Sequence, residues 1–393
     1  MTLLNVVNLY PHKRTMQKIQ RLFIYGLLTI TLCVPSFIIF NFNEDNPHDI
    51  KTSLPVIMAE RLRSLKENCK LIHTDLQPGS FYTEEIDTVL AVNQYRLCKV
   101  AKCGCTYWLE VFLVMKRIIP PDALLNIGRQ KLHFEYNSNV LLQHYEQNET
   151  DLLIMVTRNP WHRLFSAYMD KIYRQQIDFM TLIKQINEDC NKIPTFQESL
   201  DFIVERATAK EELNVHWRPI SNLCKVCAYN YTYIVKHEQF VEESQFVLNK
   251  LWPHPSKEKD VLISLLTDKF AENSIDQLTE QFVYETPNNK CVNFLDKMRR
   301  LWISLQSQGL LSDTIAFDDS LFLNSSKETL KENIDVFVKS GNLTRLTEAE
   351  RQIQRYRHFV NAYRSVKNET LVAIQKIFWN DFLLFGYNNE LPV

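Results

Sequence analysis

The sequence predicts an α/β fold in which helices flank a central parallel sheet, preceded by an N-terminal transmembrane helix. The first part follows from three segments that read as a buried strand, a tight turn and an amphipathic helix. Repeated units of this kind form parallel sheets with helices on both faces. The second part follows from an uncharged apolar run near the N-terminus that is long enough to cross a bilayer.

The apolar run extends from Leu22 to Phe40 and contains no charge. Four basic residues precede it, whereas Glu44 and Asp45 follow it. The positive-inside rule then predicts that residues 1–21 form a cytoplasmic tail and that the rest of the chain is lumenal. A cleaved signal peptide is the competing interpretation, but its apolar region is usually shorter, and no small-x-small cleavage site follows the run. We therefore expect a signal-anchor over residues 22–40.

The remaining chain is expected to divide into a stem region over residues 41–69 and one lumenal domain over residues 70–393. The start of the stem is polar and unpatterned, and residues 56–69 then predict a helix that leads into the domain. No Pro-, Gly- or Ser-rich linker interrupts the domain. The composition is 45% hydrophobic and 23% charged, as in globular proteins. The net charge of −1 gives no overall attraction to nucleic acid, although it leaves room for a local basic cleft.

The cysteines fit an oxidising compartment, because eight of the nine lie beyond the apolar run. Disulfides are therefore expected, but the sequence does not select a pairing. The C-x-x-C pair Cys224 and Cys227 can be half of a zinc site or a redox pair. Alternatively, the two cysteines form a disulfide with each other or with distant cysteines. A zinc site needs two further ligands at paired spacing, and none is evident. Disulfides are the favoured interpretation, and no metal is expected.

The first strand–turn–helix unit contains a candidate anion site. A short run to Val100 leads into the turn, and a one-sided helical stripe follows at Trp108, Val111, Phe112 and Met115. Gly104 lets the backbone approach an oxyanion closely, while Lys102 adds a charge and Thr106 a hydroxyl donor. An ordinary turn with an exposed lysine is the alternative. The lysine precedes the glycine, so the order of a nucleotide-triphosphate loop is absent and a kinase or NTPase is disfavoured.

The second and third units place further turns at the same sheet edge. Residues 152–156 are an unbroken apolar run, after which Asn159 is suited to the N-cap and Pro160 to the first helical position. Arg158 at the strand end and Ser166 about two helical turns later can grip a phosphate. The third unit is a strand and a helix in YTYIVKHEQFVEESQFVLNKLW. Because ligands bind at the carboxyl ends of parallel strands, two anion sites suggest a ligand with phosphates at two ends.

Four ordered blocks carry a resemblance to the Golgi carbohydrate sulfotransferases. The first turn reads AKCGCTYW and resembles their P-K-V/A-G/A-C/S-T-x-W loop. The second reads VTRNPWHRLFSAYMDK and resembles their V-R-D/E-P-F-E-R-L-x-S-A-Y/F-x-D/N-K segment. The third block, HWRPISNLCKVCAYNYTYIVKHE, and the C-terminal NDFLLFGY are similar to two further family blocks. The resemblance covers residues 95–387 and is greatest to the branch that sulfates chondroitin, dermatan and N-acetylgalactosamine.

This resemblance implies a P-loop-like sulfotransferase fold, a type II Golgi membrane protein, and 3′-phosphoadenosine 5′-phosphosulfate (PAPS) as the sulfate donor. The acceptor would be a glycan or proteoglycan, chondroitin-like or containing N-acetylgalactosamine, and no metal is required. Arg158 and Ser166 match the residues that bind the 3′-phosphate, and His133 lies roughly where related enzymes carry a catalytic base. The loop that binds the 5′-phosphosulfate corresponds to Lys102, Cys103, Gly104, Cys105, Thr106 and Tyr107.

Some residues depart from the family pattern or have two interpretations. Ala101 replaces the loop proline, and Thr232 and Val235 replace an aspartate and a glycine of the third block. His216 can be a structural residue that locks a turn, and Arg163 can face either the donor or solvent. An inactive PAPS-binding lumenal protein and a cysteine-rich, metal-binding ectodomain therefore stand as alternatives to the enzyme.

Overall fold

The computed structural model describes the chain from residue 47 onward with several gaps. The described residues are 47–72, 89–124, 127–142, 145–174, 179–186, 192–267, 274–275, 278–279, 294–322, 329 and 346–392. The expected cytoplasmic tail and the apolar run over residues 22–40 lie outside them. Within the described part, no helix combines the length and the hydrophobicity that a membrane crossing requires. The sheet and the helices discussed below, from Leu54 of the first described helix onward, belong to the compact unit Leu54–Val393.

The centre of this unit is a five-stranded sheet with the strand order β3-β1-β2-β4-β5. The strands are β1 (Val89–Val92), β2 (Tyr95–Cys98), β3 (Leu141–Leu142), β4 (Leu152–Thr157) and β5 (Tyr231–Lys236). Strands β2, β4 and β5 are parallel, as predicted, but β1 pairs antiparallel with both β2 and β3. The expectation of a wholly parallel sheet was therefore wrong. Only two residues, Asn93 and Gln94, connect β1 to β2, and so short a connection can join only antiparallel strands.

The three strand–turn–helix units are present at the predicted places. Their helices are α3 (Cys105–Met115), α6 (Pro160–Ala167) and α10 (Phe240–Leu251). The Asn159 side chain accepts a hydrogen bond of 2.9 Å from the Trp161 amide, and Pro160 occupies the first turn. This is the predicted N-cap, which satisfies one of the amides that a helix start leaves unpaired. Helix α6 continues as the π-helical segment η3 (Tyr168–Tyr173).

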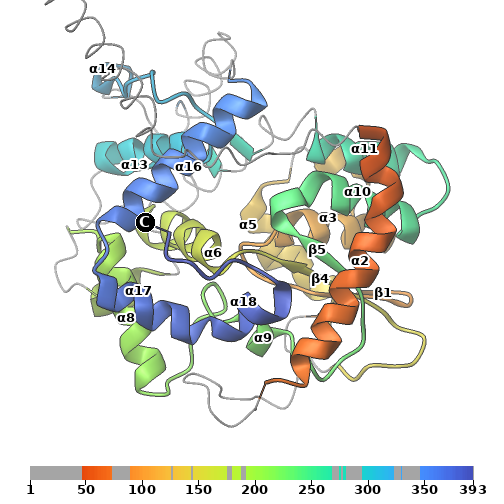
Figure 1. The fold of residues 1–393 in the computed structure, drawn as a ribbon. Coiled ribbons are helices and arrows are strands. Elements are labelled where there is room, and N and C mark those ends of the chain that lie inside the picture. The colour runs from red at the N-terminus through yellow and green to blue at the C-terminus, as the bar shows by residue number, and fades with distance from the viewer. Residues whose placement is uncertain are drawn as a thin grey trace, which may run out of the picture. The chain divides into compact units, whose positions relative to one another are not determined.

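Two large apolar cores, and a smaller third one around α13 (Phe294–Ser307), hold the described helices in place (Figure 1). The first contains the strands together with α2 (Pro47–Cys69), α3, α10 and α11 (Lys257–Leu266). The second contains α6, α8 (Phe196–Thr208), α16 (Glu348–Arg364), α17 (Asn368–Ile377) and α18 (Trp379–Phe385). The remaining elements are α4 (Pro121–Leu124), α5 (Arg129–Lys131), η1 (Leu132–Tyr136), η2 (Asn137–Asn139), α7 (Met180–Ile186), α9 (Ile220–Leu223), η5 (His237–Gln239), α13 (Phe294–Ser307) and α14 (Asp319–Phe322).

The helix expected over residues 56–69 is the second half of α2, which begins earlier than predicted. Met58 and Leu65 of α2 are buried in the first core, and Arg61 forms an ion pair of 2.6 Å with the buried Glu243 of α10. The boundaries that we expect between tail, anchor, stem and domain stay a prediction.

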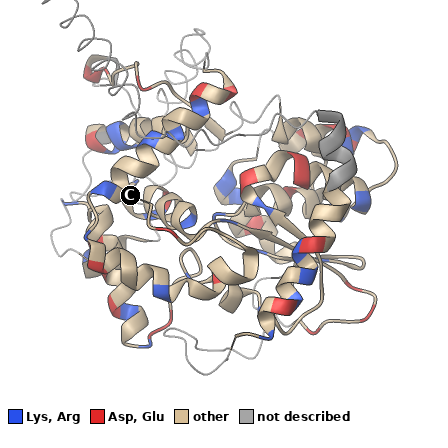
Figure 2. Ribbon diagram, in the orientation of Figure 1, with Lys and Arg blue, Asp and Glu red and all other residues tan. Residues whose placement is uncertain are grey.

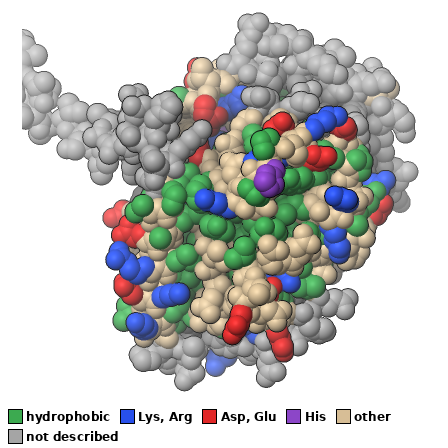
Figure 3. Space-filling model, turned by 90° about the vertical axis from the view of Figure 1, so that its right-hand side faces the viewer, with side chains coloured by type: hydrophobic (Ala, Val, Ile, Leu, Met, Phe, Trp, Pro, Cys, Tyr) green, Lys and Arg blue, Asp and Glu red, His purple; other side chains and the backbone are tan. Residues whose placement is uncertain are grey.

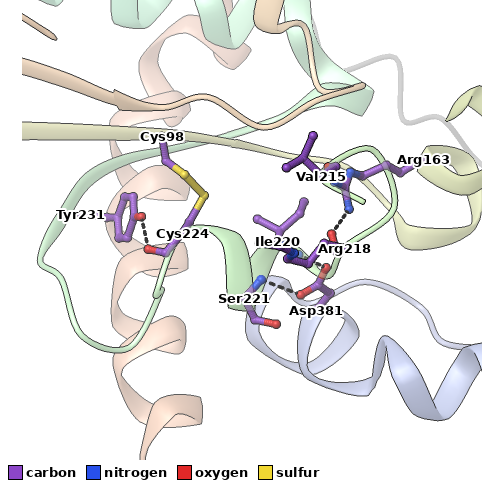
Figure 4. The surroundings of a disulfide bond; sticks show 9 residues. All are labelled: Cys98, Arg163, Val215, Arg218, Ile220, Ser221, Cys224, Tyr231 and Asp381. Atoms are coloured by element: carbon purple, nitrogen blue, oxygen red, sulfur yellow. Dashed lines mark hydrogen bonds between the residues drawn. A yellow bond between two sulfur atoms is a disulfide. The ribbon is translucent and has the colours of Figure 1, made fainter. Parts of the chain in front are cut away.

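The C-x-x-C pair forms two disulfides to distant partners. Cys227 is bonded to Cys69 at the end of α2, and Cys224 to Cys98 at the end of β2. Figure 4 shows the second bond beside Tyr231, whose hydroxyl donates to the Cys224 carbonyl at 2.7 Å. The described part of the chain holds no cluster of three or more His, Cys, Asp or Glu side chains arranged for a metal ion.

Candidate functional site

The turns after the three parallel strands meet at one edge of the sheet. Parallel strands end on the same side, so the segments that follow β2, β4 and β5 are neighbours. The Arg158 guanidinium donates to the carbonyl of Lys102 at 2.9 Å, which links the turns after β4 and β2. The Asn159 amide donates to a carboxylate oxygen of Glu238 at 2.9 Å, which links the turns after β4 and β5. The predicted anion sites therefore share one edge.

The glycine in the first turn is required by both conformation and space. Gly104 has φ 77° and caps the N-terminus of α3. A Cβ atom at this position would lie 2.3 Å from the ring of Phe240, the first residue of α10. Side chains other than glycine rarely adopt such a φ, and so short a contact forces a shift. The turn therefore requires glycine at position 104, because the Phe240 ring packs where a side chain would begin.

Lys102 lies inside a cluster of basic residues centred on one buried carboxylate. Its Nζ atom is 2.7 Å from Oδ2 of Asp170, the third residue of η3. Arg129 and Lys171 lie within 3.4 and 3.5 Å of the same oxygen, and Arg174 contacts the other oxygen. We call these five residues the Asp170 cluster. Burial, together with the positive charges of the other three cations, lowers the pKa of Lys102 well below its usual value.

His133 lies beside the first turn. One of its ring nitrogens, Nε2, is 3.1 Å from the hydroxyl of Thr106 in the first turn of α3. Burial and the positive charges of Lys99, Arg129 and others lower the pKa of His133 well below its usual value, so the ring is neutral at pH 7. A neutral imidazole can accept a proton. The structure thus places the candidate base next to the candidate phosphosulfate loop.

The other predicted loop residues differ in accessibility. The side chain of Cys103 is buried, and burial raises the pKa of its thiol to about 12. The Tyr107 ring is also buried and packs edge-on against Phe240 and Trp108. Contacts from Cys103 and Tyr107 to a ligand would therefore come from their backbone. Cys105 is half-buried at the first position of α3, and neither loop cysteine is in a disulfide.

The predicted pair Arg158 and Ser166 lies at the two ends of α6. Arg158 is half-buried directly before the helix, and Ser166 is half-buried on its penultimate residue. Among the described residues, the Ser166 side chain forms no hydrogen bond or ion pair with another predicted site residue. The structure therefore joins Arg158 to the first turn but does not by itself join Ser166 to it.

Arg163 holds the site together and faces neither a ligand nor solvent. Its guanidinium is almost fully buried and donates to the backbone carbonyls of Ala101 at 3.1 Å, Val215 at 2.9 Å and Arg218 at 2.6 Å. Figure 4 shows it reaching into the 215–218 turn. The sequence suggested that Arg163 faces either the donor or solvent, and both interpretations were wrong. Its partners include the turn at Val215 and Arg218 in the third block, which neither interpretation considered.

The C-terminal block also supports the edge. The Asp381 carboxylate is buried and accepts the amides of Ile220 and Ser221 at 2.7 and 2.8 Å (Figure 4). The Tyr387 hydroxyl lies 3.0 Å from the Thr157 hydroxyl, at the end of β4, and donates to Glu238 at 3.0 Å. Hydrogen bonds from the third block and the C-terminal block therefore stabilise the turns in the first two blocks.

Sequence reasoning missed most of the Asp170 cluster and the role of Phe240. Asp170 and Lys171 lie in the second family block, and this position could have identified them as candidate site residues. Arg129 and Arg174 have no such signal, because they join the cluster only through the fold.

The basic positions in α5, which include Arg129, appear in blue in Figure 2. On the face drawn in Figure 3, by contrast, basic and acidic side chains are interspersed around a hydrophobic centre.

Comparison with known proteins finds similarity to sulfotransferases. Residues 91–253, which contain the three strand–turn–helix units, match the model of the sulfotransferase family. Carbohydrate sulfotransferase 9 of Homo sapiens is 23% identical over 212 residues, which cover 49% of this chain and 47% of that protein. Carbohydrate sulfotransferase 14 of Mus musculus is 26% identical over 185 residues, which cover 41% and 45%. The resemblance predicted from the sequence is therefore confirmed, at low identity.

The chain spans about half the length of the curated relatives it matches. Carbohydrate sulfotransferase 8 of Mus musculus is a further relative, 21% identical over 217 residues, which cover 50% of this chain and 51% of that protein. No solved structure matches the chain.

Proposed function

We propose that this chain is a PAPS-dependent carbohydrate O-sulfotransferase that transfers a sulfuryl group to a glycan hydroxyl. The observation that carries the proposal is the junction of the turns after β2 and β4, where Arg158 donates to the Lys102 carbonyl beside the bare backbone at Gly104. The similarity to carbohydrate sulfotransferases supports a glycan as acceptor. The sequence resemblance favours a chondroitin-like glycan or one that contains N-acetylgalactosamine.

The site residues fit the donor in charge and shape. The start of α3 offers unpaired amides and a backbone that approaches closely at Gly104, which suits the 5′-phosphosulfate. Lys102 supplies a positive charge at that position. Arg158, with Ser166, would bind the 3′-phosphate. Burial, and after it the nearby positive charges, lower the pKa values of Lys102 and His133, and a bound anion would offset the repulsion among those charges.

The proposed reaction is an in-line displacement at sulfur. The acceptor hydroxyl oxygen forms a bond to sulfur while the bond from sulfur to the 5′-phosphate oxygen breaks, and the electron pair leaves with adenosine 3′,5′-bisphosphate. His133 accepts the hydroxyl proton. Lys102 stabilises the negative charge that develops on the leaving oxygen. As in phosphoryl transfer, positioning and charge stabilisation supply most of the catalysis.

We further propose a Golgi location with residues 22–40 as a type II membrane anchor and the catalytic domain in the lumen. The two disulfides, Cys69–Cys227 and Cys98–Cys224, fit an oxidising compartment. The similarity to carbohydrate sulfotransferases agrees with this placement.

The experiment is incubation of the purified chain with radiolabelled PAPS and a panel of desulfated glycans, followed by disaccharide analysis. Label in a galactosamine-containing glycan is the expected result. Transfer to a small phenol or steroid, with none to any glycan, would contradict the acceptor. Binding of the bisphosphate without any transfer would favour the inactive PAPS-binding protein. Stoichiometric zinc in the purified chain, with no nucleotide binding, would favour the metal-binding ectodomain.

A further inference from the structure

An arginine of α16, far along the sequence, lies on the face of that helix that packs against α6. Helix α16 packs against α6 (Figure 1), where the His162 ring stacks on Phe359 with centroids 4.1 Å apart and planes at 17°. Arg355 precedes Phe359 by four residues, so it lies on the same face of α16, one turn away. This face packs against α6 at His162, and α6 begins two residues after Arg158.

The electrostatic environment agrees with that placement. Burial, with the positive charges of Arg158 and Arg355, lowers the pKa of His162 to about 3. The same three causes lower the pKa of His237, the first residue after β5, well below its usual value. The charge of Arg355 also contributes to the lowered pKa of Arg158. The charges of Arg158 and Arg355 therefore act together on His162 in α6 and on His237 in η5.

The side chains of the two arginines form no ion pair with a carboxylate of the described residues, although the charges of Glu238 and Glu348 act on Arg158 and Arg355, respectively. Among the described residues, Arg355 forms no ion pair, and the side chain of Arg158 donates to a backbone carbonyl. The nearby carboxylate of Glu238 accepts hydrogen bonds from the Asn159 amide and the Tyr387 hydroxyl. Arg355 is exposed and Arg158 is half-buried, so a ligand can reach both from solvent. Two guanidinium groups with this placement suit a phosphate dianion.

We propose that Arg355 is a donor-binding residue that, together with Arg158, binds the 3′-phosphate of PAPS. This inference rests on the proposed function. The basic residues around Lys102 and those around Arg158 form two groups. We assign one group to each end of the donor. The charges that act on Lys102 are those of Arg129, Lys171 and Arg174, whereas Arg355 acts on Arg158. The Asp170 cluster thus belongs to the 5′ end, and Arg355 to the 3′ end.

The test measures binding of adenosine 3′,5′-bisphosphate and of adenosine 5′-monophosphate by calorimetry, because only the first carries a 3′-phosphate. In the full chain with Arg355→Ala, we expect the bisphosphate to bind at least about tenfold more weakly, while the monophosphate binds as in the wild type. Arg355→Lys should lose less, because it keeps the charge. The matched control is Arg357→Ala, an exposed arginine of the same helix that pairs with Asp313 at 2.6 Å.

The outcomes separate this inference from the proposed function. If the wild type prefers the bisphosphate and Arg355→Ala keeps the full preference, the role of Arg355 is wrong and the proposed function stands. If the wild type binds neither nucleotide, the proposed function fails and this inference fails with it. An equal loss for both nucleotides, with a lower melting temperature of the unliganded variant, would show a structural role for Arg355 and overturn the inference.

Discussion

Lys102 and Asp170 form a largely buried ion pair, with 2.7 Å between Nζ of the lysine and Oδ2 of the aspartate, that connects the turn after β2 to the helical segment η3. Lys102 lies in the turn after β2, and Asp170 lies in the helical segment after β4. The aspartate also contacts three further basic side chains. The pair therefore fixes the lysine that we assign to the transferred group, and it holds several like charges together.

The first prediction concerns this carboxylate. Asp170→Asn should lower the free energy of unfolding by about 3–5 kcal/mol, because it leaves several buried cations without their shared partner. Urea unfolding measures the change, and saturating bisphosphate should recover part of it by supplying negative charge. The control is Asp313→Asn, which breaks more exposed pairs with Arg357 and His358 and should cost about 1 kcal/mol or less. Equal losses in both variants would contradict the central position of Asp170.

A second prediction concerns the glycine of the first turn. Gly104→Ala should abolish detectable donor binding and lower stability by about 1–3 kcal/mol, because the residue has a positive φ and meets Phe240. Gly386→Ala is the matched control, since Gly386 has φ 61° but nothing within 4 Å of the added atom. The double variant Gly104→Ala/Phe240→Ala should recover part of the binding loss. If Gly104→Ala bound the bisphosphate like the wild type, close backbone approach at this turn would be wrong.

The third prediction concerns pH. Folding lowers the pKa values of four histidines: His133, His162, His216 and His237. The unfolded chain therefore binds more protons below about pH 6.5, and stability is full above that pH and falls as the pH decreases. Each histidine contributes a slope of up to about 1.4 kcal/mol per pH unit. Urea unfolding between pH 7.5 and 5 checks this, and His162→Gln should reduce the slope. A stability that does not change over this range would contradict the buried, neutral histidines.

A fourth prediction concerns the disulfides. Peptide mapping without reduction should find Cys69 linked to Cys227 and Cys98 linked to Cys224, with no link between Cys224 and Cys227. Each bond closes a long loop, so removal of one by paired serine substitution should cost about 2–5 kcal/mol. A Cys224–Cys227 bond in the active protein would contradict the structure.

The local parts of the fold could be predicted because their signals are contiguous in the sequence. The apolar run that became β4, the N-cap at Asn159 and the proline after it lie within nine residues of one another. The β1–β2 hairpin was missed because its strands are only four residues long, so that the segment reads as one short run before the turn. Nothing in that stretch of sequence shows that the chain reverses at Asn93.

The site was predictable only where a residue lies in a strand–turn–helix unit or a recognised block. Lys102, Gly104 and Arg158 were found from their places at strand ends. The three carbonyl partners of Arg163 and the packing of Phe359 in α16 against His162 in α6 depend on contacts across about 50 to 200 residues of sequence, which no local pattern encodes. Such contacts arise only when the two apolar cores have formed.

The final prediction separates binding from transfer. In the proposed reaction, Lys102 acts where charge changes, whereas the charge of the 3′-phosphate that we propose Arg158 binds does not change. Interactions that are stronger in the transition state lower kcat when removed, and uniform binding interactions raise KM. Arg158→Ala should therefore weaken bisphosphate binding by about 1.5–3 kcal/mol, the scale of one charge-assisted hydrogen bond.

The most direct measurement of the central claim is transfer from radiolabelled PAPS to a desulfated galactosamine-containing glycan by the wild type and Lys102→Ala, with calorimetric titration of the bisphosphate into both. The wild type should label the glycan. Lys102→Ala should lose most of its kcat, by about 100-fold or more, while it still binds the bisphosphate. Undiminished transfer by Lys102→Ala, or no transfer by the wild type to any glycan, would contradict the account.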